Sequence, residues 1–212
     1  MRRYLRVLAT RVPVLISAIA LFTCLCVVQG QTNENPRFIR LGNEANVPSG
    51  WVQFCAGYIS ECDTKPSKPR NIVLNDTAWK DLVRVNKWVN DNIEPRTDMD
   101  HYGMVQWWRY PVDGAGACHS YALLKRRILM QAGWPREALL MTIVRETNGE
   151  GHAVLTVKTD KGELILDNLN ENIVLWSETP YHYVKRQSQA DPNVWIWLSD
   201  PREATVISSR AY

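Results

Sequence analysis

Two stretches of the chain repeat apolar residues with the period of an α-helix. In the first, the apolar positions form one stripe that ends near Ile93, with Asn75 or Asp76 as the capping residue and Pro95 as the terminator. The second stretch covers residues 118–132 and is followed by a glycine and then by a proline, the usual order at a helix end. We therefore expect a helix over each stretch.

Four later runs have the apolar pattern of β-strands. They are Leu139–Val144, His152–Thr159, Glu163–Asp167 and Val194–Leu198. Helices that precede a series of antiparallel strands are typical of an α+β domain. We expect residues 96–117 to be mostly loop.

The second and third of these strands are predicted to form a hairpin whose register follows from the sequence. Pairing Leu155 with Leu166 places the apolar residues of both strands on one face and sets a lysine opposite a glutamate on the other. In this register Asp167 lies one diagonal step from His152 on the same face, roughly 7–8 Å away at the backbone. A turn of three residues would put these two on opposite faces, but it would also break the apolar pattern. The two side chains are therefore predicted to be within reach of each other.

The N-terminus has the pattern of a secretory signal peptide. Four arginines precede a largely apolar, uncharged run over residues 12–28, and a glycine at position 30 offers a small residue for cleavage. The run is near the upper length for a signal and shorter than the roughly 20 residues of a membrane span. We therefore predict a cleaved signal peptide over residues 1–30 and a periplasmic mature protein. The alternative is an uncleaved signal that anchors the chain in the inner membrane.

Composition predicts one folded domain after the signal. The whole chain has a formal net charge of +3, and residues 1–30 contain four arginines and no acidic residue, so the remainder has a net charge of −1. Because nothing basic remains to bind a nucleic acid backbone, we expect no nucleic acid partner. The nine tryptophans argue against disorder. We expect a flexible leader over residues 31–50, a folded domain over residues 51–200 and a C-terminal tail over residues 201–212, in a monomer.

Three cysteines remain after the signal, and their predicted roles differ. Cys55 and Cys62 lie in an irregular stretch, where an exported protein is expected to join them in a disulfide worth about 2.5 kcal/mol through loop-closure entropy. The alternative, one half of a metal site, lacks further cysteines or a nearby histidine. Cys118 is then the odd cysteine, and a free thiol in an oxidising compartment indicates that the thiol is used.

Cys118 opens a predicted helix, where unpaired N–H groups and the helix dipole favour thiolate over thiol. A thiolate attacks a carbonyl carbon, an imidazole takes and returns the proton, and a carboxylate orients the imidazole. We therefore predict Cys118, His152 and Asp167 as catalytic residues. The alternatives are a buried structural cysteine, an ordinary histidine at the beginning of a strand, and an aspartate in the turn that ends a strand.

The other histidines receive no role from the sequence. His119 is next to the thiol on the predicted helix and is expected to point about 100° away from it. His101 and His182 lie in segments that resemble loops.

Five motifs carry a resemblance to a known family. They are Gly116-Ala-Cys118, Tyr121-Ala-Leu-Leu-Lys-Arg-Arg127, Gly149-Glu-Gly-His152-Ala-Val-Leu155, Leu166-Asp167-Asn168-Leu169 and Lys185-Arg-Gln-Ser188. Together they resemble the bacterial transglutaminase-like cysteine proteinases, the LapG-like periplasmic proteases, over about residues 51–198. The resemblance implies a papain-like, transglutaminase-like core in which the nucleophile helix packs on an antiparallel β-sheet. It also implies a triad of Cys118, His152 and Asp167.

The resemblance implies partners as well. Better-studied members of the group cut large surface adhesins and are held by an inner-membrane receptor that senses a cyclic dinucleotide. The resemblance therefore implies a protein substrate, with a surface adhesin as the candidate, and an inner-membrane receptor as a partner. The same triad can transfer an acyl group to an amine instead of to water, and the sequence does not separate these two reactions.

One departure from the family concerns calcium. The family usually has Asp-Cys-Glu-Asp around the nucleophile, and in LapG-like members acidic residues there help to bind calcium. This chain has Ala117, His119 and Ser120 at the acidic positions. Because calcium takes 6–8 oxygen ligands, we predict that the site is lost and that the protein needs no metal or other cofactor. The loss fits either a calcium-independent enzyme or a catalytically degraded binding domain that kept the fold.

Overall fold

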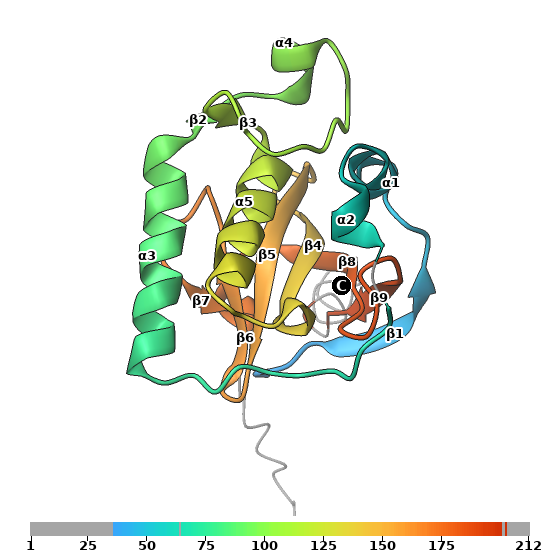
Figure 1. The fold of residues 1–212 in the computed structure, drawn as a ribbon. Helices are drawn as coiled ribbons and strands as arrows, with labels where there is room; N and C mark the ends of the chain where they lie inside the picture. The colour runs from blue at the N-terminus through green and yellow to red at the C-terminus, as the bar shows by residue number, and fades with distance from the viewer. Residues whose placement is uncertain (1–35, 64, 201, 203–212) are drawn as a thin grey trace, which may run out of the picture. The chain divides into compact units, whose positions relative to one another are not determined.

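An antiparallel β-sheet lies at the centre of the fold (Figure 1). The computed structural model describes residues 36–63, 65–200 and 202, and within these ranges seven strands form the sheet in the order β1-β9-β8-β4-β5-β6-β7. The strands are β1 (Arg40–Ala45), β4 (Leu139–Arg145), β5 (Gly151–Thr159), β6 (Gly162–Leu166), β7 (Val174–Leu175), β8 (His182–Gln187) and β9 (Trp195–Ser199). Two short parallel strands, β2 (Glu94–Pro95) and β3 (Ala115–Gly116), pair apart from this sheet.

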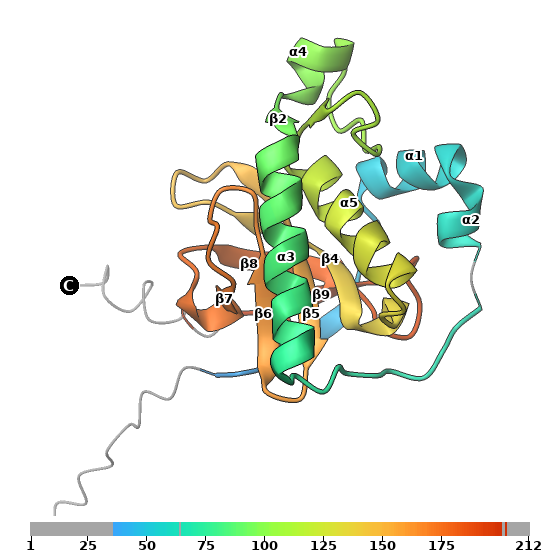
Figure 2. The same cartoon turned by 60° about the vertical axis from the view of Figure 1, so that its left-hand side comes forward.

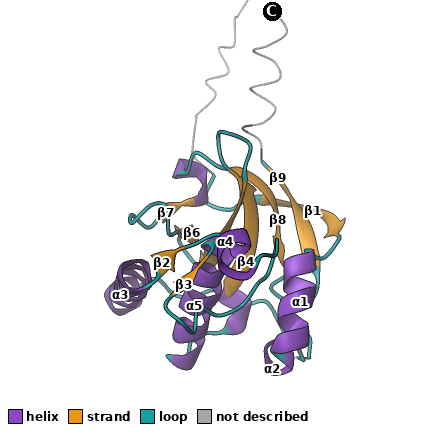
Figure 3. Cartoon of the chain, turned by 90° about the horizontal axis from the view of Figure 1, so that it is seen from above, coloured by secondary structure: helices purple, strands orange, loops and turns teal. Residues whose placement is uncertain are grey.

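Two long helices lie on one side of the sheet, side by side (Figure 2). Helix α5 (Cys118–Gln131) packs on β5 and β4, and α3 (Asp76–Asn92) packs on α5. The shorter elements are α1 (Ser49–Gly57), α2 (Ile59–Cys62), α4 (Asp98–Tyr102) and the 3₁₀ turns Arg136–Ala138 and Trp176–Glu178. Seen along the view of Figure 3, α1 and α3 lie on opposite sides of α5 and α4 lies between them. The α+β class, with the predicted nucleophile helix packed on an antiparallel sheet, is confirmed.

The predicted helix boundaries hold because the chain provides local caps. The Asn75 side-chain oxygen accepts a hydrogen bond from the N–H of Ala78 at 2.9 Å, which satisfies one of the unpaired donors at the start of α3. Leu82, Val85 and Val89 then form the buried stripe of this helix. At the end of α5, Gly133 has a φ of +87°, the left-handed conformation that closes a helix without strain only at glycine.

Strand β5 is buried on both of its faces. Leu155 and Val157 belong to the core between the sheet and the helices, which also contains Leu123 and Leu129 of α5. Val154 points to the opposite face and belongs to a second cluster built around Trp176 and Tyr183, which also contains Ile39, Val144, Ile165 and Tyr181. A strand that is covered on both faces cannot slip by one residue without exposing a whole apolar set, so its register is strongly specified.

The hairpin between β5 and β6 has the predicted register. Leu155 pairs with Leu166, Val157 with Leu164, and Lys158 with Glu163. The Lys158 ammonium donates to Glu163 at 2.7 Å, which is the predicted cross-strand ion pair. Strand β6 ends at Leu166, so Asp167 is the first residue beyond the strand and not its last.

The expectation of a flexible leader over residues 31–50 is wrong for its second half. Residues 40–45 form β1, which pairs with β9 at the edge of the sheet, and α1 begins at Ser49. The pattern hid this strand because only Ala45 of its six residues is buried. Residues 1–35, which include the predicted signal peptide, lie outside the described residues. The same is true of the predicted C-terminal tail, apart from residue 202. None of the described helices is long and apolar enough to cross a membrane.

Strand β8 was also missed by the sequence prediction, which assigned His182 to a loop. The strand begins at His182 and pairs with both β4 and β9. Two of its three buried side chains, Arg186 and Gln187, are polar: Arg186 donates to Glu163 at 2.6 Å, and the Gln187 side-chain oxygen accepts from the N–H of Met141 at 2.9 Å. A strand that buries charge and amide groups in pairs has no apolar alternation to reveal it.

The disulfide prediction is confirmed. Cys55 of α1 and Cys62 of α2 are bonded, with their Cα atoms 5.6 Å apart, and Cys118 is free. The Asn193 side chain donates to the carbonyl of Cys62 at 2.8 Å and accepts from the Trp51 indole at 3.2 Å. The disulfide thus ties the α1–α2 segment into a compact unit that the turn before β9 holds against the core.

Candidate active site

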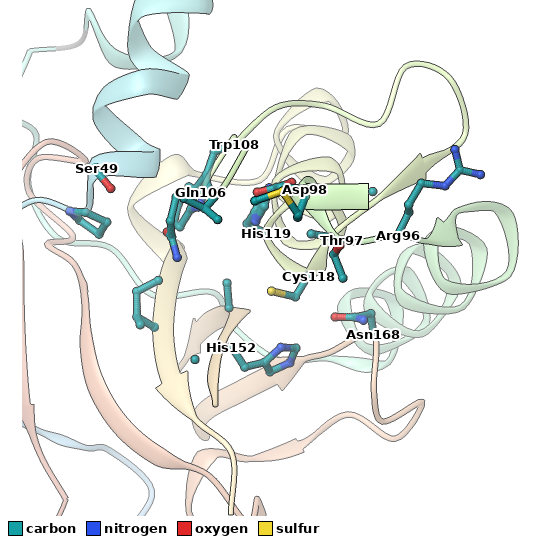
Figure 4. A pocket seen from close by; sticks show the side chains of 18 of the residues that line it. Ser49, Arg96, Thr97, Asp98, Gln106, Trp108, Cys118, His119, His152 and Asn168 are labelled. Atoms are coloured by element: carbon teal, nitrogen blue, oxygen red, sulfur yellow. The ribbon is translucent and has the colours of Figure 1, made fainter. Parts of the chain in front are cut away.

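A cleft of about 990 Å³ opens at the N-terminal end of α5 (Figure 4). Its walls come from the start of α1, from β2 and α4 with the loop that follows, from the start of α5, and from β4, β5 and the segment after β6. Cys118, His152 and Asn168 line it from three different elements. In Figure 4 the Cys118 sulfur lies between the rings of His119 and His152, and the amide of Asn168 points towards it.

Cys118 is the first residue of α5 and is half-buried. The capping residue Ala117 makes no side-chain hydrogen bond to the helix, and its carbonyl oxygen accepts from the N–H groups of Ser120 at 2.8 Å and Tyr121 at 3.4 Å. The donors that this helix start leaves unpaired are then the N–H groups of Cys118 and His119. A Cβ atom at Gly116 would lie 2.6 Å from the Cβ of Ser120, so only glycine lets β3 run this closely into the helix. The fold thereby presents the thiol to the cleft at the positive end of the helix dipole.

His152 and Asp167 are brought together behind the thiol. The Nε2 atom of His152 lies 2.8 Å from Oδ1 of Asp167, and both side chains are about 3% exposed. The other carboxylate oxygen, Oδ2, accepts a hydrogen bond from the Tyr181 hydroxyl, and Oδ1 also accepts from the N–H of Leu169 at 3.1 Å. Since Nε2 faces the carboxylate, Nδ1 is left for Cys118. The structure therefore brings the three predicted residues into one chain of contacts.

The main chain of Asp167 is fixed as firmly as its side chain. The Lys125 ammonium, on α5, and the Asn90 amide, on α3, both donate to the Asp167 carbonyl oxygen at 2.9 Å. Lys125 is fully buried, with no exposed surface. Both long helices therefore hold the residue that orients His152.

The charges of the site favour an ion pair between sulfur and imidazole. Burial raises the pKa of the Cys118 thiol, but hydrogen bonds and charge from His119 and His152 outweigh it and bring the pKa down to about 6. Burial lowers the pKa of His152, while Asp167 and the thiolate outweigh it and raise that pKa to about 10. For Asp167, burial raises the pKa and hydrogen bonds from His152 and Tyr181 lower it below its usual range. At neutral pH, Cys118 is therefore a thiolate, His152 an imidazolium and Asp167 a carboxylate, so that positive and negative charges alternate across the site.

Comparison with known families identifies the chain. The sequence profile of the bacterial transglutaminase-like cysteine proteinases, BTLCP, matches residues 41–203. The chain belongs to this family. It is a transglutaminase-like cysteine peptidase, and the matched region includes β1, in agreement with the ordered strand found there.

The proteinase is also similar to solved structures of LapG from Legionella pneumophila. One LapG structure has 24% sequence identity and a TM-score of 0.49, with 78% of this chain and 88% of that chain covered. The calcium-bound form has 23% identity and a TM-score of 0.48, with 62% and 80% covered. The EGTA-treated form has 24% identity and a TM-score of 0.48, with 74% and 81% covered. No curated protein matched the chain.

Sequence reasoning about this proteinase missed four residues around the thiol. They are Asn90, His119, Lys125 and Tyr181. The expectation that His119 points away from the thiol is wrong: its side chain lines the cleft beside Cys118 and lowers the pKa of the thiol. One signal was available, because Lys125 follows Cys118 by seven residues, or two helical turns, and so shares its face of the helix.

No metal centre is evident in the proteinase within the described residues. No group of three or more His, Cys, Asp or Glu side chains there is arranged to hold a metal ion. Ala117 lines the cleft with a methyl group, and Ser120 is buried against Gly116. Neither side chain provides a carboxylate, the group that the family pattern has at these two positions.

Proposed function

We propose that the protein is a periplasmic endopeptidase that hydrolyses peptide bonds of a protein substrate with a triad of Cys118, His152 and Asp167. The observation that carries the proposal is the buried 2.8 Å contact between His152 and Asp167 behind a free thiol in an open cleft. A cysteine that served packing alone would need neither an oriented imidazole nor access to a cleft. The family membership makes the reaction a proteolytic one.

The first half of the reaction forms an acyl-enzyme. The Cys118 thiolate attacks the carbonyl carbon of the scissile bond and forms a C–S bond. When the tetrahedral intermediate collapses, the C–N bond breaks, and the His152 imidazolium gives its proton to the leaving amine. Asp167 keeps the ring in one orientation throughout, because Nε2 stays bound to its carboxylate.

The second half releases the product. His152, now neutral, takes a proton from water as the water attacks the thioester carbon. The C–S bond breaks, the acid product leaves, and the thiolate and imidazolium are restored. Both halves pass through an oxyanion, and the unpaired N–H groups at the start of α5, next to Cys118, are the donors we propose for it.

The shape of the cleft supports a polypeptide substrate. Small residues flank the thiol on both strands that border it: Gly116 and Ala117 precede it, and Gly151 and Ala153 flank His152 on β5. Without large side chains at these positions, the backbone of an extended segment can approach the sulfur. A surface adhesin as the substrate and an inner-membrane receptor as the partner follow from the resemblance to LapG-like members.

The compartment is supported by the chain itself. A disulfide joins Cys55 and Cys62, and such bonds persist in oxidising compartments such as the periplasm. Residues 1–30 have the composition of a signal peptide that would direct the chain there. The acidic residues of the family's calcium site are replaced at Ala117, His119 and Ser120, so the proposed enzyme works without calcium.

The test is to incubate purified protein lacking residues 1–30 with a peptide library prepared from a bacterial proteome. New N-termini produced by the parent and not by Cys118→Ala, identified by mass spectrometry, would support hydrolysis by this thiol. Equal cleavage by both proteins would refute the triad. Products joined to an added amine, in place of free acids, would show acyl transfer instead. Cleavage by neither protein, with the thiol intact, would favour the binding domain.

A further inference from the structure

His119 lies on the other side of the sulfur from His152 (Figure 4). Its side chain is about 6% exposed, and its ring stacks on Trp108 with the centroids 5.3 Å apart and the planes within 6° of parallel. Trp108 packs directly on the backbone of Gly50, so closely that a Cβ atom at that position would lie 2.2 Å from the indole. The imidazole is therefore held in a built pocket beside the thiol.

A carboxylate accompanies this second imidazole. Oδ1 of Asp98 lies 3.3 Å from Nε2 of His119, at a distance that allows an ion pair but without hydrogen-bond geometry. Oδ2 of Asp98 accepts the N–H of Trp107 at 2.7 Å, and the residue is about 8% exposed. A buried carboxylate that is fixed by the main chain next to a buried histidine keeps a positive charge on that histidine.

We propose that His119 and Asp98 form a second histidine–carboxylate pair that holds Cys118 as a thiolate from the side opposite His152. This inference rests on the proposed function only in that Cys118 is the nucleophile. During acylation His152 gives its proton to the leaving amine and becomes neutral, so the first pair loses its cation at that moment. In the proposed step His119 does not transfer its proton, so it keeps a positive charge beside the sulfur through the whole cycle.

Several titratable or charged groups line the cleft around His119, and two of them act on its pKa. The titratable or charged side chains that line the cleft with His119 are Cys118 on α5, Asp98 and Asp100 on α4, Arg96 before α4, Glu146 after β4, His152 on β5 and Lys185 on β8. Of these, Asp98 and Cys118 act on His119 directly. Burial lowers the pKa of His119, but these two groups outweigh it and raise the pKa to about 9. The imidazole is therefore protonated wherever the thiolate exists at neutral pH.

The experiment measures the pKa of the Cys118 thiol, from the rate of alkylation with iodoacetamide between about pH 5 and pH 9. The variant His119→Phe keeps a flat ring on Trp108 and removes both nitrogens. We expect the midpoint of alkylation to rise by about one pH unit or more, so that the rate near pH 5 falls roughly tenfold. The acid limb of the kcat/KM profile should move with it, which a purely structural role would not cause.

The chain offers a matched control in His101. This histidine also pairs with an aspartate, with Nε2 2.8 Å from Asp113, and also stacks on an aromatic ring, that of Tyr102, but it does not line the cleft. His101→Phe should leave the alkylation midpoint unchanged. An unchanged midpoint in His119→Phe as well would overturn the proposal.

A second variant keeps the test decisive if His119→Phe does not fold. Asp98→Asn leaves the ring in place and still accepts the N–H of Trp107, so it removes only the charge. It should raise the midpoint in the same direction by a smaller amount, and no change would again overturn the proposal. Failure of the proposed function is a separate result, because a thiol that titrates low in the parent and high in His119→Phe supports the second pair even where no peptide is cleaved.

Discussion

The two sides of the Cys118 sulfur are built in different ways. On the sheet side, His152 is on a strand buried on both faces, and its carboxylate partner is held by Tyr181 and by Lys125. On the loop side, His119 rests on Trp108, and its partner Asp98 belongs to a five-residue helix. The imidazole–carboxylate distance is 2.8 Å on the sheet side and 3.3 Å, without hydrogen-bond geometry, on the loop side.

This difference corresponds to a difference in chemical demand. Proton transfer requires a group within hydrogen-bond reach and in a fixed orientation, so it needs the rigid side of the site. The stabilisation of a charge falls only with the inverse of distance, so it tolerates the looser side. The comparison teaches that the proton carrier and the permanent cation can be separated, with each placed on the scaffold that suits it.

The largest expected effect tests the sheet side. Cys118→Ala should abolish hydrolysis, His152→Ala should cost nearly as much, and Asp167→Asn somewhat less, because members of a triad act as a unit and losses of about 10³-fold or more are typical. Initial rates on a cleaved peptide would measure this, with melting temperatures to check the fold. If His119→Phe cost as much as His152→Ala, the comparison between the two sides would break down.

Removing the Tyr181 hydroxyl should have an intermediate effect. Tyr181→Phe deletes the donor to Oδ2 of Asp167, and the loss of a hydrogen bond to a charged group corresponds to roughly a tenfold fall in kcat. Tyr183→Phe is the matched control, since this buried tyrosine shares its hydroxyl with Thr179 at 3.1 Å and does not touch Asp167. Equal losses in both variants would indicate damaged packing in place of a role in orienting the carboxylate.

We expect Lys125 to make the free energy of unfolding depend on pH. Burial lowers the pKa of Lys125 to about 7, far below its value in an unfolded chain. Between about pH 7 and pH 10 the unfolded state therefore binds a proton that the folded state does not, and the stability contribution of this residue rises with pH. Below about pH 7 the folded state carries the full penalty of a buried charge.

The variant Lys125→Met removes this penalty together with the hydrogen bond to Asp167. Its melting temperature relative to the parent should therefore be highest near neutral pH and should fall as the pH rises towards 10. Lys80→Met, at an exposed position on α3, should show no such trend. A difference between Lys125→Met and parent that does not vary with pH would contradict a depressed pKa.

The smallest expected effect is that of calcium. A ligand that binds only the folded state at one hundred times its Kd stabilises it by about 2.7 kcal/mol, which a melting curve detects easily. We expect neither millimolar calcium nor a chelator to shift the melting temperature or the rate. A calcium-dependent shift would show that other oxygens complete a site, and it would place a metal on the loop side where we propose a histidine.

The sequence predicted the sheet side well, for a physical reason. The period of two along β5 and β6 fixes the register, and the register places Asp167 next to His152 before any tertiary structure is known. Likewise the cap at Asn75 and the glycine after α5 set the helix boundaries locally.

The loop side could not be predicted in this way. His119 reaches the thiol only because Trp108 and Asp98 fold over the start of α5, and no local period encodes such contacts. Strands β1 and β8 were missed for a related reason. The first is an exposed edge, and the second buries Arg186 against Glu163, so neither has the apolar alternation that identifies a strand.

The pairing of the cysteines has a consequence for how long the enzyme stays active. Within the described residues Cys118 is the free cysteine, since Cys55 and Cys62 are joined to each other. Peroxide converts a thiolate to sulfenic acid, which a neighbouring thiol can trap reversibly as a disulfide before further oxidation makes the damage permanent. The described part of the chain offers no such neighbour. Rescue of the oxidised enzyme then depends on small thiols in its surroundings, and its working lifetime is set by the balance of oxidants and reductants outside the fold.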